Sequence, residues 1–158
     1  MKKIFSVLIA CLALSTQALG STDTQKATRT GVDDHGRNCL FSYQITKEAP
    51  SSVSHHRDIV YKILLENLGS CDLRDVVVVD HLSRRVQFLD ATPGYILRDD
   101  KVIWKDVRIE ENRKAFFFIK VEPRTEHEVE LVDNTASAFA REVGQKISAT
   151  VSTTVFRR

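Results

Sequence analysis

Short apolar runs separated by turn signals recur along residues 40–156, and this pattern restricts the fold more than any other feature. Within a run, apolar residues recur at every second position, as Tyr61, Ile63 and Leu65 do. Side chains of a strand point alternately to its two faces, so this spacing places one apolar row against a core. No segment keeps helical spacing over about three turns. The pattern therefore predicts an all-β fold, a single antiparallel β-sandwich.

The turn signals set the expected strand boundaries. Residues 47–57 form a polar connection that contains Pro50, and Pro93-Gly94 marks a turn. A single helical turn fits only at 83–85 or 108–114. The expected strands are 40–46, 58–66, 74–82, 86–91, 95–97, 102–104, 114–122, 128–140 and 146–156.

Residues 1–20 have the anatomy of a secretory signal peptide. Lys2 and Lys3 are followed by an apolar run over 4–14, far shorter than the roughly 20 residues that span a bilayer. Small residues before Ser21 predict cleavage there. An alternative is a lipoprotein box ending at Cys11, which would tether the protein through a lipid. We expect an exported protein of the periplasm, outer envelope or cell surface, with no transmembrane segment.

Removal of residues 1–20 also changes the charge. The whole chain has 23 basic and 21 acidic residues, and Lys2 and Lys3 account for the excess. The mature chain is formally neutral, so bulk electrostatics would not attract nucleic acid. Residues 21–38 are polar, have no period and predict a flexible arm. The expected domain is therefore 39–158.

The two cysteines that remain after export are Cys39 and Cys71. Cys39 precedes the first expected strand and Cys71 follows the second. If these strands are antiparallel, both cysteines lie at the same end of the sandwich. An even pair in an oxidising compartment predicts a disulfide, and the alternative is two free thiols.

Six short motifs, in order, resemble the bacterial domain of unknown function 11, or conserved repeat domain. The resemblance covers about residues 40–156 and implies an immunoglobulin-like β-sandwich of cell-surface and envelope proteins. This chain departs from the family at Ser83, where a proline is usual, at 110–113, where a glycine is usual, and in having one copy. The matching motifs are Lys47 with Pro50, Tyr61 through Asn67-Leu68-Gly69, Val76-x-Val78-x-Asp80-x-Leu82, Val86-Gln87-Phe88, Val102-Ile103-Trp104 and Asn134-Thr135-Ala136.

Two of these motifs have a structural interpretation. Asn67-Leu68-Gly69 is expected to end a strand at a corner, because Asn and Gly accept backbone angles that other residues resist. Asp80 is expected to cap a turn by accepting hydrogen bonds from nearby amides, with a carboxylate ligand as the alternative. Trp104 is expected to pack in the core.

The sequence lacks the patterns of common catalytic sites, including a nucleophile elbow and a phosphate-binding glycine loop. His55, His56 and Asp58 come nearest to a metal cluster, but adjacent residues of an extended chain point opposite ways. The aspartate pairs at 33–34 and 99–100 lack the oxygen spacing of a calcium loop. We therefore expect no enzyme, no cofactor and no metal site.

Several strands have apolar residues on both faces. If Tyr61, Val76 and Phe117 point inward, other large apolar side chains point outward. If their strands are neighbours, these side chains form a candidate partner surface. A β-bulge that shifted the register would exchange the faces. The outward residues are Leu64, Val77, Val79, Phe116 and Phe118.

The sequence therefore predicts a non-enzymatic, secreted module that binds protein, or itself, or serves as a structural subunit of an envelope or surface assembly. The alternative is an accessory domain that binds a carbohydrate or metal ligand through loops at one end. The fold does not name the partner.

Overall fold

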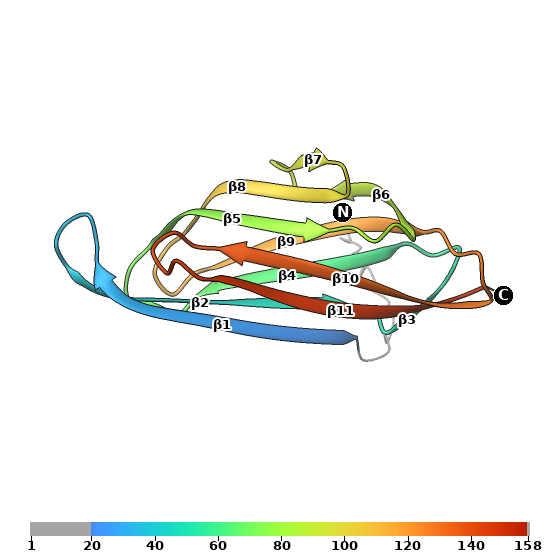
Figure 1. Ribbon diagram of the computed structural model, residues 1–158, viewed down its shortest axis with the longest axis horizontal. Coiled ribbons are helices and arrows are strands. Elements are labelled where there is room, and N and C mark those ends of the chain that lie inside the picture. Colours follow the sequence, from blue (N-terminus) through green and yellow to red (C-terminus); the bar gives the residue numbers. More distant parts are fainter. Residues whose placement is uncertain (1–19, 158) are drawn as a thin grey trace, which may run out of the picture.

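The alternating runs of the sequence form strands that pack as two sheets in a computed structural model, which describes residues 20–157. The strands run along the length of the molecule (Figure 1). The five-stranded sheet has the order β1-β2-β4-β9-β6 and the six-stranded sheet the order β3-β11-β10-β5-β8-β7. The strands are β1 (Ser21–Val32), β2 (Asn38–Ala49), β3 (Ser52–Ser54), β4 (Ile59–Asn67), β5 (Leu73–His81), β6 (Val86–Ala91), β7 (Ile96–Arg98), β8 (Lys101–Ile109), β9 (Lys114–Pro123), β10 (Val129–Phe139) and β11 (Lys146–Phe156).

The predicted all-β sandwich is confirmed. Neighbouring strands pair antiparallel, except that β3 runs parallel to β11. The two-residue period places one apolar row of each long strand between the sheets. Tyr61, Ile63 and Leu65 of β4 are fully buried there, as are Val76 and Val78 of β5.

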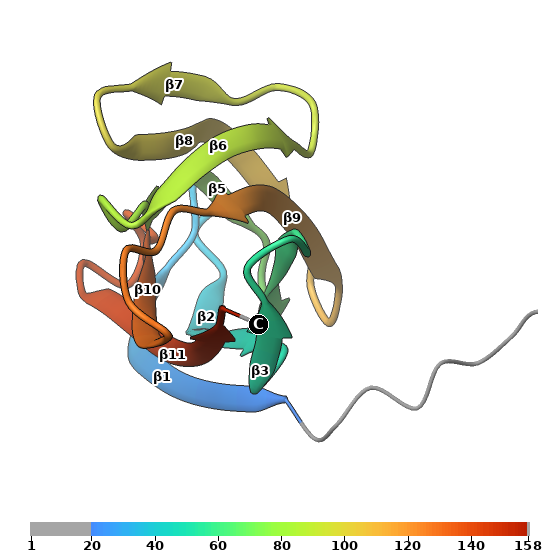
Figure 2. The ribbon, with the colours of Figure 1, turned by 90° about the vertical axis from the view of Figure 1, so that its right-hand side faces the viewer.

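The prediction of a flexible arm at 21–38 is wrong for most of that segment. β1 pairs with β2 along its whole length, from Ser21 opposite Ala49 to Val32 opposite Asn38. Figure 2 shows β1 curving past β2 and β11 at one side of the sandwich. Only Ala27 of β1 is buried. An edge strand is held by main-chain hydrogen bonds, so it needs no apolar period, and the sequence pattern missed it.

Two smaller differences concern the strand ends. β8 continues to Ile109, where a helical turn was expected, and β3 was not expected at all. The β5–β8 ladder has register shifts between Leu73 and Val78. Asp75 and Asp106 adopt positive φ angles of 52° and 55°. Such bulges add residues to a strand and break the simple alternation that predicts it.

The turn at 110–113 lacks the glycine of the resembled family and has an asparagine in the left-handed conformation instead. Asn112 has φ of 55°, the left-handed conformation that asparagine tolerates better than most residues. Residues 1–19 of the predicted signal peptide, and with them the alternative lipid site at Cys11, lie outside the described residues. Residues 20–157 contain no helix long and apolar enough to cross a membrane.

Candidate functional site

Three polar side chains lie together in the core between the sheets, and we call them the buried cluster: Lys47 of β2, Asp80 of β5 and Asn134 of β10. The side chains of Lys47 and Asp80 are 0% exposed and form an ion pair through Asp80 Oδ2. Asn134 is 2% exposed, and its Nδ2 donates to Asp80 Oδ1 at 2.8 Å. One carboxyl group therefore contacts the lysine amine with one oxygen and the asparagine amide with the other.

The strand period puts each member of the buried cluster inside. Lys47 follows Tyr43 and Ile45 on the inward face of β2, and Asp80 follows Val76 and Val78 on that of β5. Asn134 lies between the buried Val132 and Ala136 of β10, which occupy alternate positions. Asp80 is paired with Ala136 in the β5–β10 ladder, which places its side chain beside that of Asn134.

The surroundings of the buried cluster favour uncharged side chains. Burial lowers the pKa of Lys47, and the charge and hydrogen bond of Asp80 oppose this change. The Lys47 amine lies 5.0 Å from the centre of the Tyr61 ring. Burial also raises the pKa of the Tyr61 hydroxyl.

Two polar atoms at the buried cluster have no hydrogen-bond partner among residues 20–157, namely Asn134 Oδ1 and the Tyr61 hydroxyl. The Asn134 amide is oriented by the His81 carbonyl, which accepts from Nδ2 at 2.9 Å. A buried polar atom without a partner costs about 1–3 kcal/mol, so such atoms in a core call for an explanation.

The expected turn cap at Asp80 is therefore a wrong prediction. The carboxylate points into the core and contacts side chains of two other strands, and no backbone amide of residues 20–157 donates to it. The position of Asp80 in the two-residue alternation of its strand could have identified this role. Lys47, Asp80 and Asn134 each occupy an inward position of a strand, where an apolar residue is usual.

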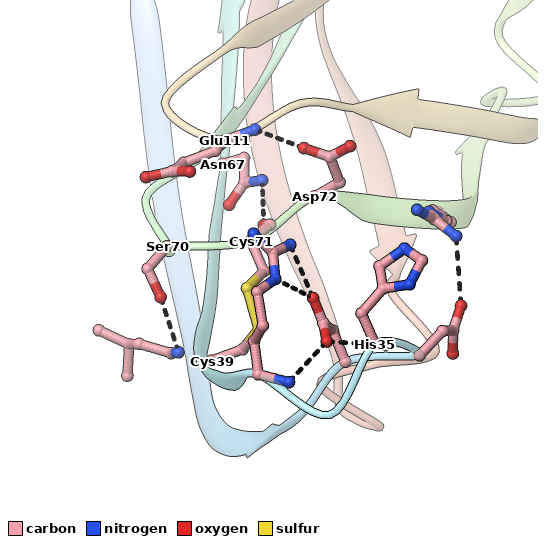
Figure 3. A network of polar contacts seen from close by, with 12 residues as sticks. His35, Cys39, Asn67, Ser70, Cys71, Asp72 and Glu111 are labelled. Carbon is pink, nitrogen blue, oxygen red and sulfur yellow. Dashed lines mark hydrogen bonds and ion pairs between the residues drawn. A yellow bond between two sulfur atoms is a disulfide. The ribbon is translucent and has the colours of Figure 1, made fainter.

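At the β4–β5 corner, the disulfide predicted between Cys39 and Cys71 is confirmed, with Cα atoms 5.8 Å apart. It lies beside Asn67 in the network of Figure 3. Asn67 Nδ2 donates to the carbonyls of Cys71 at 2.8 Å and Ile109 at 3.0 Å, and Asn67 Oδ1 accepts from the Gly69 amide. Ser70 accepts a hydrogen bond from the Leu40 amide at 3.0 Å.

The corner at Asn67-Leu68-Gly69 is confirmed, but for a different reason from the one expected. Neither Asn67 nor Gly69 has a positive φ. A Cβ on Gly69 would lie 2.2 Å from the Leu40 carbonyl oxygen, so glycine is required for close approach to β2. Asn67 is required for its buried amide, which links three segments of backbone.

A depression of about 640 Å³ lies at the β1–β2 hairpin, beside the disulfide. Two ion pairs lie in its lining, Asp33 with Arg37 at 2.7 Å and Asp34 with Arg74 at 3.2 Å. Asp33 also accepts from the amides of His35 and Arg37, and these hydrogen bonds lower its pKa. Asp33 lies near both cysteine sulfurs, but these are bonded to each other and cannot ligate a metal as thiolates.

His55 and His56 were expected to point opposite ways, and this is wrong. They lie in the turn after β3, and their ring centroids are 3.5 Å apart. Asp58 forms an ion pair with Lys120 at 2.7 Å instead of joining them.

The outward-facing apolar residues divide between the two sheets. Leu64 and Phe116 are partners in the β4–β9 ladder, and Phe118 lies two positions further along β9. Phe116 and Phe118 are 47% and 44% exposed. Val77 and Val79 lie on β5 in the other sheet, where Val77 faces Phe139 of β10.

Two surfaces result from this division. We call Leu64, Phe116 and Phe118 the β4–β9 face, and Val77, Val79 and Phe139 the β5–β10 face. The condition for one continuous surface is not met, because β5 and β9 belong to different sheets. Trp104 is in the core as predicted, 3% exposed, with its ring centroid 4.8 Å from that of Phe117.

No family model and no curated protein matches this sequence. Among solved structures, the chain is similar to domains D2 and D3 of the major pilin SpaD from Corynebacterium diphtheriae, with TM-score 0.51 and 11% identity. That match covers 84% of this chain and 52% of the other. It is also similar to an uncharacterized protein from Nocardia farcinica with an immunoglobulin-like fold, with TM-score 0.43, 16% identity and coverage of 65% and 80%.

The two-sheet topology and the similarity to the D2–D3 domains define an immunoglobulin-like β-sandwich. The chain spans about half of the D2–D3 structure and, in a match with TM-score 0.49 and 13% identity, 33% of full-length SpaD. The resemblance to the domain of unknown function 11 stays a prediction.

Proposed function

We propose that this chain is a non-enzymatic, exported immunoglobulin-like module that serves as a structural or protein-binding subunit of a bacterial envelope or surface assembly. The observation that carries the proposal is the pair of outward apolar faces on opposite sheets. A subunit with contact surfaces on both sides can join two neighbours, and heterologous contacts of this kind extend into chains.

Exposed aromatic residues support a contact role for the β4–β9 face. Phe116 and Phe118 project from the same side of β9, and the Lys62 amine lies 5.7 Å from the centre of the Phe116 ring. Aromatic side chains are enriched at the centres of protein interfaces. The solvent-facing side of an antiparallel sheet, in contrast, normally carries polar residues.

Two further features fit an extracellular setting. The Cys39–Cys71 disulfide is typical of oxidising compartments. Domains of this fold occur in a major pilin, SpaD. In the buried cluster, the side chains of Lys47 and Asp80 are fully buried, and this favours a role inside the domain.

Site-specific photo-crosslinking in the native host tests the proposal. A photoreactive amino acid is placed singly at Phe118, at Phe139, and at Asp99 as a control in the exposed β7–β8 turn. Irradiation of intact cells should give discrete adducts from positions 118 and 139 in the envelope fraction. The proposal fails if neither position gives more adduct than Asp99, or if the protein stays in the cytosol.

Phe118→Lys and Val77→Lys provide a second test. Combined with the photoreactive amino acid at Phe116 for the first and at Phe139 for the second, each should abolish the adducts of its own face and leave the thermal midpoint of the purified protein nearly unchanged. Unfolding by both variants would show that these residues stabilise the core and are not contact residues.

The alternative of a carbohydrate- or metal-binding domain would use the depression at the β1–β2 hairpin. Its aspartates already pair with arginines of the same chain. This pairing favours the structural function, and calorimetric titration with zinc, calcium and oligosaccharides would detect the alternative.

A further inference from the structure

We propose that the domain modifies itself: Lys47 and Asn134 condense to an intramolecular isopeptide bond between the two sheets, with Asp80 as the acid–base group. The modification is independent of the partner that the module binds.

The geometry places a nucleophile, an electrophile and a proton carrier together. Lys47 contacts Asp80 Oδ2, and Asn134 Nδ2 lies 2.8 Å from Asp80 Oδ1, so the amine and the carboxamide are neighbours across one carboxyl group. All three side chains are at most 2% exposed. Water is thus kept from the carboxamide, and hydrolysis does not compete with attack by the amine.

The chemistry begins with a proton transfer from the Lys47 ammonium to the Asp80 carboxylate. A buried lysine favours its neutral form, and burial lowers the pKa of Lys47 in this cluster. The neutral amine is a nucleophile of the kind that desolvated lysines provide.

The neutral Nζ then attacks Cγ of Asn134 and forms a tetrahedral intermediate. Asp80 donates its proton toward the developing oxyanion, and protons pass through the same carboxyl group from Nζ to the departing Nδ2. The Cγ–Nδ2 bond breaks and the Nζ–Cγ bond remains. The products are a secondary amide, one molecule of ammonia and a protonated Asp80, so no oxidant, reductant or cofactor is needed.

The reaction would also remove an unfavourable feature of the core. A buried ion pair carries a large desolvation cost, whereas an amide and a neutral carboxyl group are both uncharged. Within the described part of the chain, no group donates a hydrogen bond to the Asn134 side-chain carbonyl oxygen. A protonated Asp80 would provide a donor beside it, which a purely structural ion pair does not.

Mass spectrometry of the purified full chain, after disulfide reduction, tests the inference. The wild-type protein should be lighter than its sequence by about 17 Da, the ammonia lost when an amine replaces the amide nitrogen. Digestion should release one branched peptide that joins the segment around Lys47 to the segment around Asn134. A folded wild-type protein with its full sequence mass would overturn the inference.

Two variants identify the participating groups. Lys47→Met removes the nucleophile with little change in side-chain length, and Asp80→Asn removes the acid–base group but keeps hydrogen-bonding capacity. Both should have the full mass and migrate more slowly than wild type in denaturing gels after reduction. An internal succinimide at an asparagine would lose the same ammonia, but its mass deficit would persist in Lys47→Met, and that result would also overturn the inference. If either variant fails to fold, the branched peptide of the wild type decides alone.

Discussion

The buried cluster and the β1–β2 hairpin end both contain ion pairs between a carboxylate and a cationic side chain. The pair in the cluster lies in the core, and the pairs at the hairpin end lie at the surface. Lys47 and Asp80 are fully enclosed, whereas Arg37 and Arg108 are 68% and 59% exposed in their pairs with Asp33 and Asp72. Exposed pairs are screened by water and contribute little to stability. A buried charge without its partner is strongly unfavourable. The difference shows that burial, more than the number of ion pairs, decides which charges this fold depends on.

The largest effect should come from Asp80→Ala, which leaves the Lys47 amine in the core without its partner. Loss of one member of a buried pair costs about 3–5 kcal/mol, and loss of an isopeptide bond would add to this. Urea denaturation of the disulfide-bonded protein measures the change. Asp58→Ala, which breaks a half-exposed pair with Lys120, is the matched control and should cost about 1 kcal/mol or less. Equal effects of the two variants would break the comparison between buried and exposed pairs.

Removal of the disulfide should have the next largest effect. The bridge closes a sequence separation of 32 residues, and the chain-entropy relation gives about 3.7 kcal/mol for a loop of this length. The double variant Cys39→Ala/Cys71→Ala should lower the urea midpoint accordingly. A change below about 1 kcal/mol would mean that the corner network holds the β4–β5 connection without the bridge.

Asn67→Ala should have an intermediate effect. It leaves the buried carbonyls of Cys71 and Ile109 and the Gly69 amide without their side-chain partner, which we expect to cost about 2–3 kcal/mol. Asn38→Ala, at an exposed position, should stay within about 0.5 kcal/mol. Thermal unfolding of both variants measures the contrast, and similar midpoints would show that the Asn67 hydrogen bonds are replaced by water.

The smallest effect concerns pH at the hairpin end. Hydrogen bonds from the Arg108 side chain and the Glu111 amide lower the pKa of Asp72 below its ordinary value of 3.8. The unfolded chain then takes up the proton first as the pH falls, so the stabilisation is complete well above 3.8 and is lost below it.

Asp72→Asn should therefore lower the thermal midpoint slightly at neutral pH. The gap from wild type should close as the pH falls below 3.8 toward the folded-state pKa. Asp100→Asn, on the exposed β7–β8 turn, is the control. A gap that stays constant across this range would show that the ion pair contributes nothing to stability.

The long strands of the fold could be predicted from the sequence, because apolar residues recur along them at every second position, as a strand requires. The predicted strands at 86–91 and 146–156 have the same bounds as β6 and β11. β1 could not be predicted, since its partner is the backbone of β2 and its side chains are mostly exposed. The second half of β8 was not predicted either, because the bulges at Asp75 and Asp106 interrupt the apolar alternation.

Some features of the candidate site could also be predicted from the sequence, and others could not. The sequence predicted the Cys39–Cys71 bridge because antiparallel neighbours bring the start of one strand to the end of the next. It also predicted the outward direction of Phe116 and Phe118, because the side-chain period fixes the face once one inward residue is known. It could not assign Val77 and Phe118 to different sheets, since strand order depends on packing between distant segments.

The sequence by itself determined the all-β class, the inward rows of each long strand and the paired cysteines. These follow from local alternation and from the chain's own connectivity. Only the tertiary structure decided that Lys47, Asp80 and Asn134 meet, because they come from strands far apart in the chain and from both sheets. Each residue alone is an unexplained polar group in an apolar row. Their common environment exists only when the two sheets close over them and exclude water.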